Sequence, residues 1–216
     1  MIASVYGPRP IVRVGGAEGA QGLAVSQVGS SQRATTSSGG VLGNEFSEEA
    51  IVTCDWRYST FADSIEEYAT DNERELSMAV AQALELAIIR SAYPKSSIDV
   101  NILVLQDDGA CLSCAITCAG LALAHAGIQL FDLVPACTIS ICSPSLELYL
   151  DPTRAEEKNQ KGQLQLALMS GTQSANLMKQ CGELSPEQTL AAVKMATQGC
   201  QHIHSLLRQA LTAVRS

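Results

Sequence analysis

The chain has little positive charge. Lys and Arg number 14 against 22 Asp and Glu, which gives a net charge of −8 and a pI near 4.8. A domain that binds nucleic acid with its own surface usually carries a basic stripe or a strongly basic balance, and no such stripe is visible in the sequence. If RNA is involved, most contacts to its phosphates must therefore come from partner proteins.

The sequence also has no long apolar run and no signal-peptide pattern in MIASVYGPRP. A membrane-spanning helix needs roughly 18 consecutive apolar residues or more, and a secretory signal needs a charged start followed by an apolar stretch. We therefore expect a soluble, intracellular protein without a membrane partner. Apolar residues make up 46% of the 216 residues, which suffices for the core of one domain, with or without a long insertion.

Residues 14–44 are rich in Gly, Ser, Ala, Thr and Gln and have no hydrophobic period. Such a segment cannot bury enough apolar surface to offset the entropy of ordering, so we predict a disordered loop. Its glycines lack the Walker spacing that ends in Lys-Ser or Lys-Thr. This absence disfavours a phosphate-binding loop.

The cysteines lie mostly inside apolar periodic segments: Cys54, Cys111, Cys114, Cys118, Cys137, Cys142, Cys181 and Cys200. In a reducing compartment such residues behave as small hydrophobes. Cys111 and Cys114 form a C-x-x-C pair, which a redox or zinc site can use. No second C-x-x-C and no paired-His motif completes a tetrahedral set. We predict core cysteines, no metal and no cofactor, with a C-x-x-C redox or metal-binding protein as an alternative.

The clearest pattern runs from Tyr93 to Leu133. Apolar residues that alternate in its first part predict a strand buried on one face: Ile98, Val100, Ile102 and Val104. Asp107, Asp108 and Gly109 then predict a tight turn. A helix is predicted from Ser113 to Gly127, with an apolar stripe at helical spacing: Cys114, Cys118, Leu121, Ala122 and His125. Small residues such as Ala119 and Gly120 should let this helix press closely on a sheet.

Strands and helices alternate along the rest of the chain. Strands are predicted at 3–6, 49–55, 133–142, 146–150, 164–168 and 174–179. Gly7-Pro8 is expected to end the first of them, and the last two are expected to pair as a hairpin through Gly171. One helix is predicted at 73–90, with a core stripe of Leu76, Val80, Ala83, Leu84, Ala87 and Ile88. Another begins at Ser185, where Ser-Pro-Glu-Gln is an N-cap pattern. Helices on one side of a mixed sheet make an α+β two-layer domain.

Several segments resemble one family. LQDDG followed by ACLSCAITCAGLALAHAGIQLFDLV is similar to the central block of the RNase PH family, and VYGPRP, ERELSMAVAQALELAI and LDPTRAEEK resemble parts that flank it. Within the family, the resemblance is to non-catalytic ring subunits of the eukaryotic RNA exosome. It implies a single RNase PH-like α+β domain over residues 1–216, with helices packed on a mixed β-sheet. The family's first strands are missing from this sequence, so we expect a partner to cover the open sheet edge.

The resemblance also locates the positions at which the family performs catalysis. Catalytic members carry an arginine in the first long helix, an arginine in the turn after the LQ-x-D motif, and an aspartate near the start of a late strand. Gln82, Leu112 and Gln163 stand at the corresponding positions. Two cations that would bind phosphate and one acid are thus replaced. The resemblance therefore implies that this chain is not an enzyme.

The function that the resemblance implies is that of a structural subunit in a hexameric exosome ring. Its partners would be other RNase PH-like ring subunits and RNA-binding cap proteins, and RNA would be met indirectly, through the ring pore. The processes would be 3′-to-5′ RNA processing and degradation, including rRNA maturation and mRNA decay, in nucleus, nucleolus and cytoplasm. The alternative is a phosphorolytic 3′–5′ exoribonuclease subunit that is active only with a partner.

A few other polar residues stand out in the sequence. Arg57 follows a predicted strand and is either a solvated loop arginine or, by the resemblance, a contact to RNA that passes the ring. His202 and His204 are two residues apart and so lie on different helix faces, which predicts surface positions without acid partners. Glu156 and Glu157 are predicted to be a solvated carboxylate pair.

Overall fold

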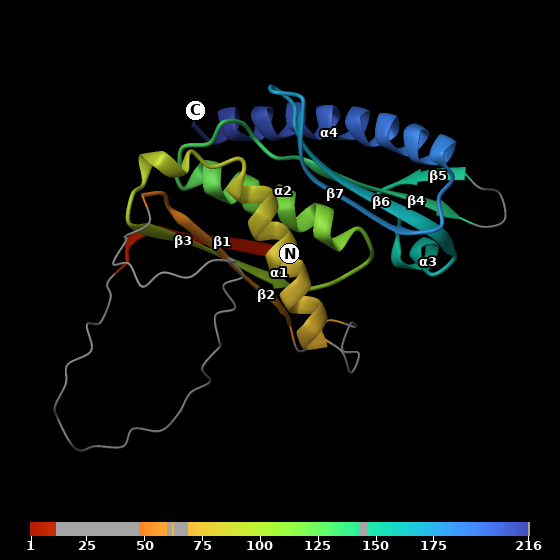
Figure 1. Ribbon diagram of the computed structural model, residues 1–216, viewed down its shortest axis with the longest axis horizontal. Helices are drawn as coiled ribbons and strands as arrows, with labels where there is room; N and C mark the ends of the chain where they lie inside the picture. The colour runs from red at the N-terminus through yellow and green to blue at the C-terminus, as the bar shows by residue number, and fades with distance from the viewer. Residues whose placement is uncertain (12–47, 60–61, 63–68, 143–146, 216) are drawn as a thin grey trace, which may run out of the picture.

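The computed structural model describes residues 1–11, 48–59, 62, 69–142 and 147–215 (Figure 1). Its strands are β1 (Ile2–Pro10), β2 (Ile51–Tyr58), β3 (Ser96–Val104), β4 (Ala136–Cys142), β5 (Glu147–Leu150), β6 (Gln160–Met169) and β7 (Ser174–Gly182). Its helices are α1 (Ala69–Glu85), the 3₁₀ turn η1 (Arg90–Ala92), α2 (Cys111–His125), α3 (Arg154–Glu157) and α4 (Pro186–Arg215). The loop predicted to be disordered at 14–44 lies outside the described residues.

The first sheet has the order β1-β3-β2, with β1 antiparallel and β2 parallel to the central strand β3. The alternation predicted for β3 is confirmed, because one face of the strand is fully buried: Ile98, Val100, Ile102 and Val104. The other face is open and polar. There the Thr53 hydroxyl donates to Asp99 at 2.6 Å, and Arg9 lies 3.9 Å from the same carboxylate.

The second sheet is antiparallel throughout and has the order β5-β4-β6-β7. α4 covers one face of it, where Ile139, Leu164 and Leu166 pack against Ala192 and Ala196. α1 and α2 lie between the two sheets, as Figure 1 shows. The α+β class is confirmed, but the strands are divided between two sheets, so the prediction of one mixed sheet is wrong in this respect.

α2 is the helix that both sheets share, and this is why two sheets form instead of one. Its buried residues lie on more than one side of the helix: Leu112, Ser113, Ala115, Ile116, Ala119, Gly120 and Leu123. The predicted apolar stripe is wrong, since Cys114 and His125 are exposed. Leu and Ile fix the orientation because their burial removes more apolar area from water than burial of cysteine. The predicted close packing is confirmed: a Cβ at Gly120 would lie 3.6 Å from the Val134 carbonyl oxygen.

β1 does not end at Gly7-Pro8 as predicted. It continues to Pro10 across a register shift between Tyr6 and Arg9. Gly7 has a φ of +142°, and a Cβ there would lie 2.8 Å from the carbonyl oxygen of Ser97. Glycine therefore allows the chain to bulge while both flanks stay paired with β3.

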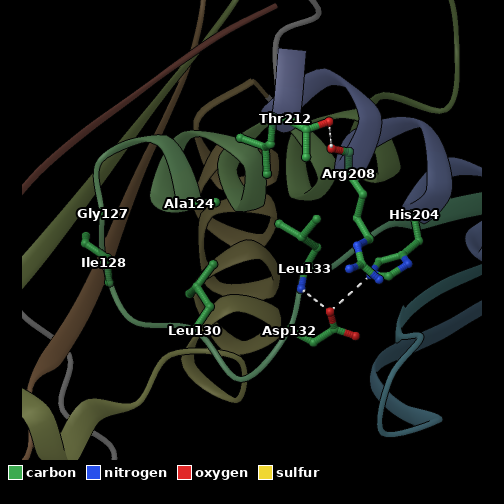
Figure 2. Close-up of a pocket in the computed structure, with 10 residues that line it drawn as sticks. Ala124, Gly127, Ile128, Leu130, Asp132, Leu133, His204, Arg208 and Thr212 are labelled. Carbon is green, nitrogen blue, oxygen red and sulfur yellow. Dashed lines mark hydrogen bonds and ion pairs between the residues drawn. The ribbon is translucent and has the colours of Figure 1, made fainter. Parts of the chain in front are cut away.

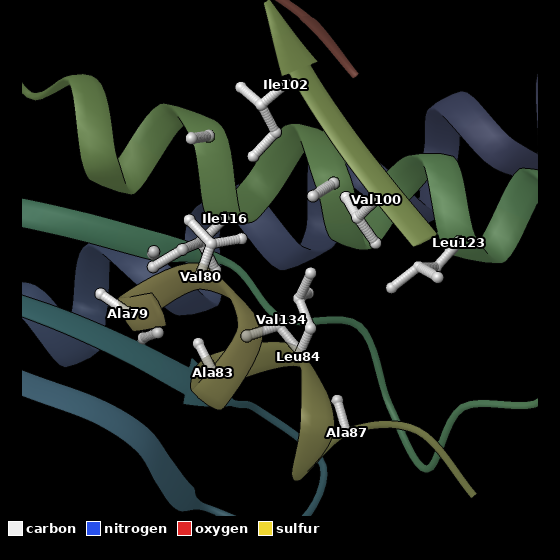
Figure 3. Close-up of a cluster of buried hydrophobic side chains, with 14 of the residues drawn as sticks. Ala79, Val80, Ala83, Leu84, Ala87, Val100, Ile102, Ile116, Leu123 and Val134 are labelled. Carbon is white, nitrogen blue, oxygen red and sulfur yellow. The ribbon is translucent and has the colours of Figure 1, made fainter. Parts of the chain in front are cut away.

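α1 ends at Glu85, earlier than the predicted end at Arg90. The following residues leave the helix because Ile88 forms a β-bridge with Leu130. Arg90 holds this connection with two ion pairs, one to Glu49 at 2.7 Å and one to Glu85. The predicted core stripe is nevertheless correct for the buried residues Val80, Ala83, Leu84, Ala87 and Ile88, which Figure 3 shows in part.

The start of α4 and the β6–β7 hairpin are as predicted. The Gln188 N–H donates to the Ser185 hydroxyl at 3.3 Å, and the Ser185 N–H donates to Gln188 Oε1 at 3.0 Å. This reciprocal pair is a capping box, and it satisfies N–H groups that the helix itself cannot pair. No helix in the described part of the chain is long and apolar enough to span a membrane.

Replacement of Ala119 with leucine is expected to lower the free energy of unfolding by roughly 1–3 kcal/mol, because extra methylenes in a packed core displace their neighbours. Ala119 is fully buried in the cluster that joins both sheets. Gly120→Ala is the matched control, since the nearest Val134 atoms at 3.6–3.8 Å leave room for a methyl group. Urea unfolding measures both variants; an Ala119→Leu protein as stable as the wild type would contradict this packing.

Candidate functional site

The turn between β3 and α2 carries the candidate site. The Gly109 N–H donates to the Asp107 carboxylate at 3.1 Å, as expected of an aspartate in a turn. Gly109 has a φ of +102°, and a Cβ there would lie 2.3 Å from the carbonyl oxygen of Pro152, so only glycine fits. The Arg154 N–H donates to the Asp108 carbonyl oxygen at 2.6 Å. These contacts hold the turn against the segment that leads into α3.

A carboxylate from the same chain occupies the amino terminus of α2. Ala110, the residue before the helix, has a φ of 49° and no cap from its own side chain. Its N–H donates to Glu157 Oε1 at 2.9 Å. Helix amino termini attract anions, because their first N–H groups lack helical partners and the helix dipole is positive there. Glu157 therefore supplies the negative charge that this end of α2 favours.

The neighbouring Glu156 caps α3. The Thr153 N–H and hydroxyl donate to Glu156 Oε2 at 2.8 and 2.9 Å, and these hydrogen bonds lower the pKa of Glu156 below its ordinary value. Glu156 is solvated as predicted while it caps α3, but the prediction is wrong for Glu157, which is partly buried against the Ala110 N–H. The reason is a long-range contact, the approach of the LDPTR segment to the α2 turn.

A small buried polar network lies behind the turn. The hydroxyls of Ser113 and Thr138 are 2.6 Å apart, which links the first turn of α2 to β4. The Thr138 N–H donates to Asp151 Oδ1 at 2.9 Å, and burial raises the pKa of Asp151 above its ordinary value. The network therefore fixes α2, β4 and the segment before α3 relative to one another.

The three positions that the sequence resemblance marks as replaced catalytic positions lie on three elements. Leu112, in the first turn of α2, is 2% exposed and belongs to the main core cluster. Gln163 is half-buried in β6, and its side-chain oxygen is buried without a hydrogen-bond partner among the described residues. Gln82 is exposed on α1. None of the three supplies a cation or a carboxylic acid.

The structure brings the region of Leu112 close to the strand pair that carries Gln163. Gln163 stands opposite Ser140 of β4 in the antiparallel register. Ser140 is two residues from Thr138 and so lies on the same face of β4, and Thr138 is the residue that bonds to Ser113 beside Leu112. The amino terminus of α2 therefore packs over the face of the second sheet that bears Gln163.

Arg57 lies within β2 and not in a loop after it, so its predicted location is wrong. The strand continues past Asp55 because Trp56, which is 1% exposed, points into the core. Arg57 pairs with Leu103 in the register and lies on the open face of the first sheet, with Nε 3.3 Å from Asp55 Oδ1. Both side chains are exposed, so this ion pair is weak. A contact between Arg57 and RNA stays a prediction.

The C-x-x-C pair has thiols that resist ionisation. Burial raises the pKa of Cys111 to about 12, and burial also raises the pKa of Cys114. Because the thiolate is the nucleophile and the metal ligand, these shifts disfavour a redox or zinc role. No three His, Cys, Asp or Glu side chains of the described residues stand together as a metal site. Cysteines are buried as predicted at Cys137, Cys142 and Cys200, but Cys114 and Cys181 are exposed.

His204 has an acid partner that the sequence pattern did not reveal. Its Nε2 lies 3.1 Å from Oδ1 of Asp132, which is 72 residues away in the chain. Asp132 also accepts the N–H groups of Leu133 at 2.8 Å and Gly171 at 2.6 Å. Burial opposes the charge on Asp132, but the hydrogen bonds from Gly171, His204 and Leu133 hold its pKa below the ordinary value. The prediction of a histidine without an acid partner is therefore wrong here, whereas His202 is exposed as expected.

Replacement of Glu157 with alanine is expected to lower the free energy of unfolding by about 0.5–2 kcal/mol, the usual cost of removing a cap. The cause is the Ala110 N–H, which loses its acceptor. Glu183→Ala removes the same charge from an exposed position and should change stability by less than about 0.5 kcal/mol. Thermal and urea unfolding compare the two variants, and equal effects would show that Glu157 does not stabilise α2.

Comparison with known proteins gives consistent results. The human exosome complex component MTR3 is 36% identical over 162 residues, which are 73% of this chain and 60% of that protein. The mouse exosome complex component MTR3 is 39% identical over 141 residues, 64% of this chain and 52% of that protein. The Rrp41 exosome component of Pyrococcus furiosus is 36% identical over 137 residues, 63% of this chain and 54% of that protein. The chain thus spans little more than half the length of these relatives.

A solved structure and two family models extend the comparison. The crystal structure of rice (Oryza sativa) Rrp46 has the same fold, with a TM-score of 0.71 over 97% of this chain and 82% of that chain, at 22% identity. Domain 1 of the 3′ exoribonuclease family, RNase PH, matches residues 7–129, and domain 2 matches residues 132–199. Because these two matches cover most of the sequence, the chain belongs to the RNase PH family of 3′ exoribonucleases.

Proposed function

We propose that this chain is a non-catalytic structural subunit of an RNA exosome ring. The proposal is supported by its family and by its identity of 36% and 39% to proteins named exosome complex component MTR3. In this role the chain would contribute protein–protein interfaces to 3′-to-5′ RNA processing and degradation, including rRNA maturation and mRNA decay. A separate nuclease would cleave the RNA. The sites of action would be the nucleus, nucleolus and cytoplasm.

The proposal rests mainly on which side chains occupy the amino terminus of α2. Phosphorolysis requires inorganic phosphate to be held beside the scissile phosphodiester, and arginine does this with its planar fork of N–H donors. The side chain at the corresponding position is Leu112, which is buried in the core. The helix end itself already contacts the carboxylate of Glu157. A phosphate at this place would find leucine where the resemblance expects arginine, and it would meet a negative charge.

The remaining two positions support the same conclusion. Gln163 replaces an acid, and an amide can neither protonate a leaving oxygen nor carry the charge that places a metal ion. Gln82 replaces an arginine and is exposed on α1. Glutamine donates hydrogen bonds but carries no positive charge to offset phosphate. The chain therefore lacks, at all three positions, the groups that the chemistry of its family uses.

The surfaces left open suit a role in assembly. Large apolar side chains are exposed next to the connection between the sheets, among them Leu86 at 58% and Phe131 at 63%. β1 and β2 each end the first sheet with an edge whose backbone groups have no strand partner among the described residues. Neighbouring RNase PH-like ring subunits would cover such surfaces, and RNA-binding cap proteins would supply the basic contacts that a chain of net charge −8 lacks.

A second candidate function is a phosphorolytic exoribonuclease subunit that acts only with a partner. The turn at Gly109, which leads into α2, favours this candidate, because it keeps the aspartate and glycine of the family's LQ-x-D motif in a well-fixed turn. A neighbour that inserted its own arginines there could supply the missing cations. The two candidates differ in whether nucleoside diphosphates are released.

The purified chain is expected to release no nucleoside diphosphates from RNA, with or without inorganic phosphate, because Leu112 and Glu157 leave no place for the phosphate ion. Thin-layer chromatography of labelled RNA products measures the release. The same assay on the chain paired with each RNase PH-like ring subunit separates the two candidates. Phosphate-dependent release by the chain alone would contradict the proposal, and release only by a pair would favour the second candidate.

The isolated chain is expected to gain stability from a ring subunit that binds it. Stable interfaces bury on the order of 1,200–2,000 Å². A partner at about 100 times its dissociation constant adds about 2.7 kcal/mol by mass action, which corresponds to a rise in Tm of roughly 5–10 °C for a domain of this size. Size-exclusion chromatography and thermal melts with co-expressed subunits measure this. A monodisperse monomer whose Tm stays the same with every candidate subunit would contradict the structural role.

A further inference from the structure

A groove of about 550 Å³ lies between the carboxyl-terminal part of α4 and the end of α2. We define this α2–α4 groove by six of its lining residues: Ala124, Ile128, Leu130, Leu133, Arg208 and Leu211. Figure 2 shows the aliphatic side chains of the loop after α2 facing the side chains of α4 across this space. The volume falls within the range of roughly 300–1,000 Å³ that is usual for ligand sites.

The groove exists because α4 continues beyond the sheet that it covers. In its first half the core stripe is complete, with Ala192, Ala196 and Cys200 fully buried against β4 and β6. From 201 to 213 no residue of α4 is buried, although the apolar stripe continues through Leu207 and Leu211, which are only half-covered. A helix that presents an apolar stripe normally packs it against something. Among the described residues, nothing fills this part of the stripe.

One end of the groove is fixed in position by the Asp132 carboxylate. Its two oxygens accept hydrogen bonds from the His204 ring, Leu133 N–H and Gly171 N–H. These bonds connect α4, the loop after α2 and the β6–β7 turn. The acid is therefore already satisfied, and the loop that carries Leu130 and Leu133 is anchored to α4 at this point.

Arg208 provides the groove with a positive charge that is not neutralised. It lies one helical turn after His204, is exposed, and makes no ion pair with any described residue. Figure 2 shows its side chain extending beside His204 at the mouth of the groove. Asp132, which also lines the groove, already accepts three hydrogen bonds, and no ion pair joins it to Arg208. A guanidinium in this setting favours an incoming carboxylate, which it can bind in fork geometry.

We propose that the α2–α4 groove binds a short segment of another polypeptide that combines one or two bulky apolar side chains with a nearby Asp or Glu. The apolar side chains would lie between Leu130, Leu133 and Leu211, and the carboxylate would bind Arg208. The charge complementarity selects an acidic segment over a basic one. The proposal is independent of the ring role, since it rests only on the geometry of this groove.

The lining of the groove favours a peptide over RNA. Most of its walls are aliphatic, and its lining residues include no Phe, Tyr or Trp; the one ring, the imidazole of His204, is held by Asp132. It offers one unpaired cation beside a carboxylate, whereas a nucleic-acid strand needs several cations along its backbone. A peptide needs only one polar anchor next to an apolar contact, which is what the groove presents.

The test selects a phage-displayed random-peptide library on the full chain and on three variants that are first shown to fold by circular dichroism and thermal melting. Arg208→Glu reverses the charge at the groove. Thr212→Trp covers the groove from an exposed position on α4. Lys194→Glu makes the same charge change on an exposed position of α4 that is outside the groove.

The wild type and Lys194→Glu are expected to enrich the same peptides, with Asp or Glu close to Leu, Ile, Phe or Met. Arg208→Glu should bind these peptides at least about tenfold more weakly, measured by fluorescence anisotropy of a labelled selected peptide, and should enrich Lys or Arg in place of the acid. Thr212→Trp should abolish the enrichment. No enrichment on the wild type, or binding that Arg208→Glu and Thr212→Trp leave unchanged, would overturn the proposal. So would a short RNA oligonucleotide, or a second copy of the chain, that binds in an Arg208-dependent way and displaces the peptides.

Discussion

The rest of the structure depends on the burial of α2 between two sheets. The helix can be covered on more than one side because its residues are either small, such as Ala119 and Gly120, or apolar and bulky, such as Ile116 and Leu123. The first sheet contributes Val100 and its neighbours to the same cluster, and the second sheet contributes Ala136 and Ala167. Without this helix the first sheet would lose much of the cluster on its buried face, and the second sheet would keep only the face that α4 covers. The position of every candidate site residue follows from it.

The amino terminus of α2 bears most directly on whether the chain can bind phosphate. Its location beside the second sheet is fixed by the bond between Ser113 and Thr138, and its turn is held against the segment before α3 by Gly109. A family that handles phosphate could use this end of the helix as an anion site. Here the anion is the chain's own Glu157, and the side chain that follows the turn is the buried Leu112. In the role that we propose, the fold would be retained while this anion site is occupied by the chain's own carboxylate.

Local signals in the sequence predicted local structure well. The alternation in β3, the core stripe of α1, the β6–β7 hairpin and the capping box at Ser185 each depend on residues close together in the chain, and all were confirmed. The orientation of α2 was not predicted, since it depends on which two sheets cover the helix. Glu157 at Ala110 and Asp132 at His204 were missed because the partners are 47 and 72 residues apart. The importance of Leu112 came only from resemblance to a family.

The burial of α2 between the two sheets also affects how parts of the protein can unfold. The two family domains meet near residue 130, with domain 1 ending at 129 and domain 2 beginning at 132. Separate sequence domains often exchange their amide hydrogens with solvent as separate cooperative units. Because α2 belongs to domain 1 yet is buried against β4 and β6 of domain 2, neither half can open without exposing the core of the other. We therefore expect the two domains to unfold as one cooperative unit, with the amides of α2 exchanging only when the whole chain unfolds.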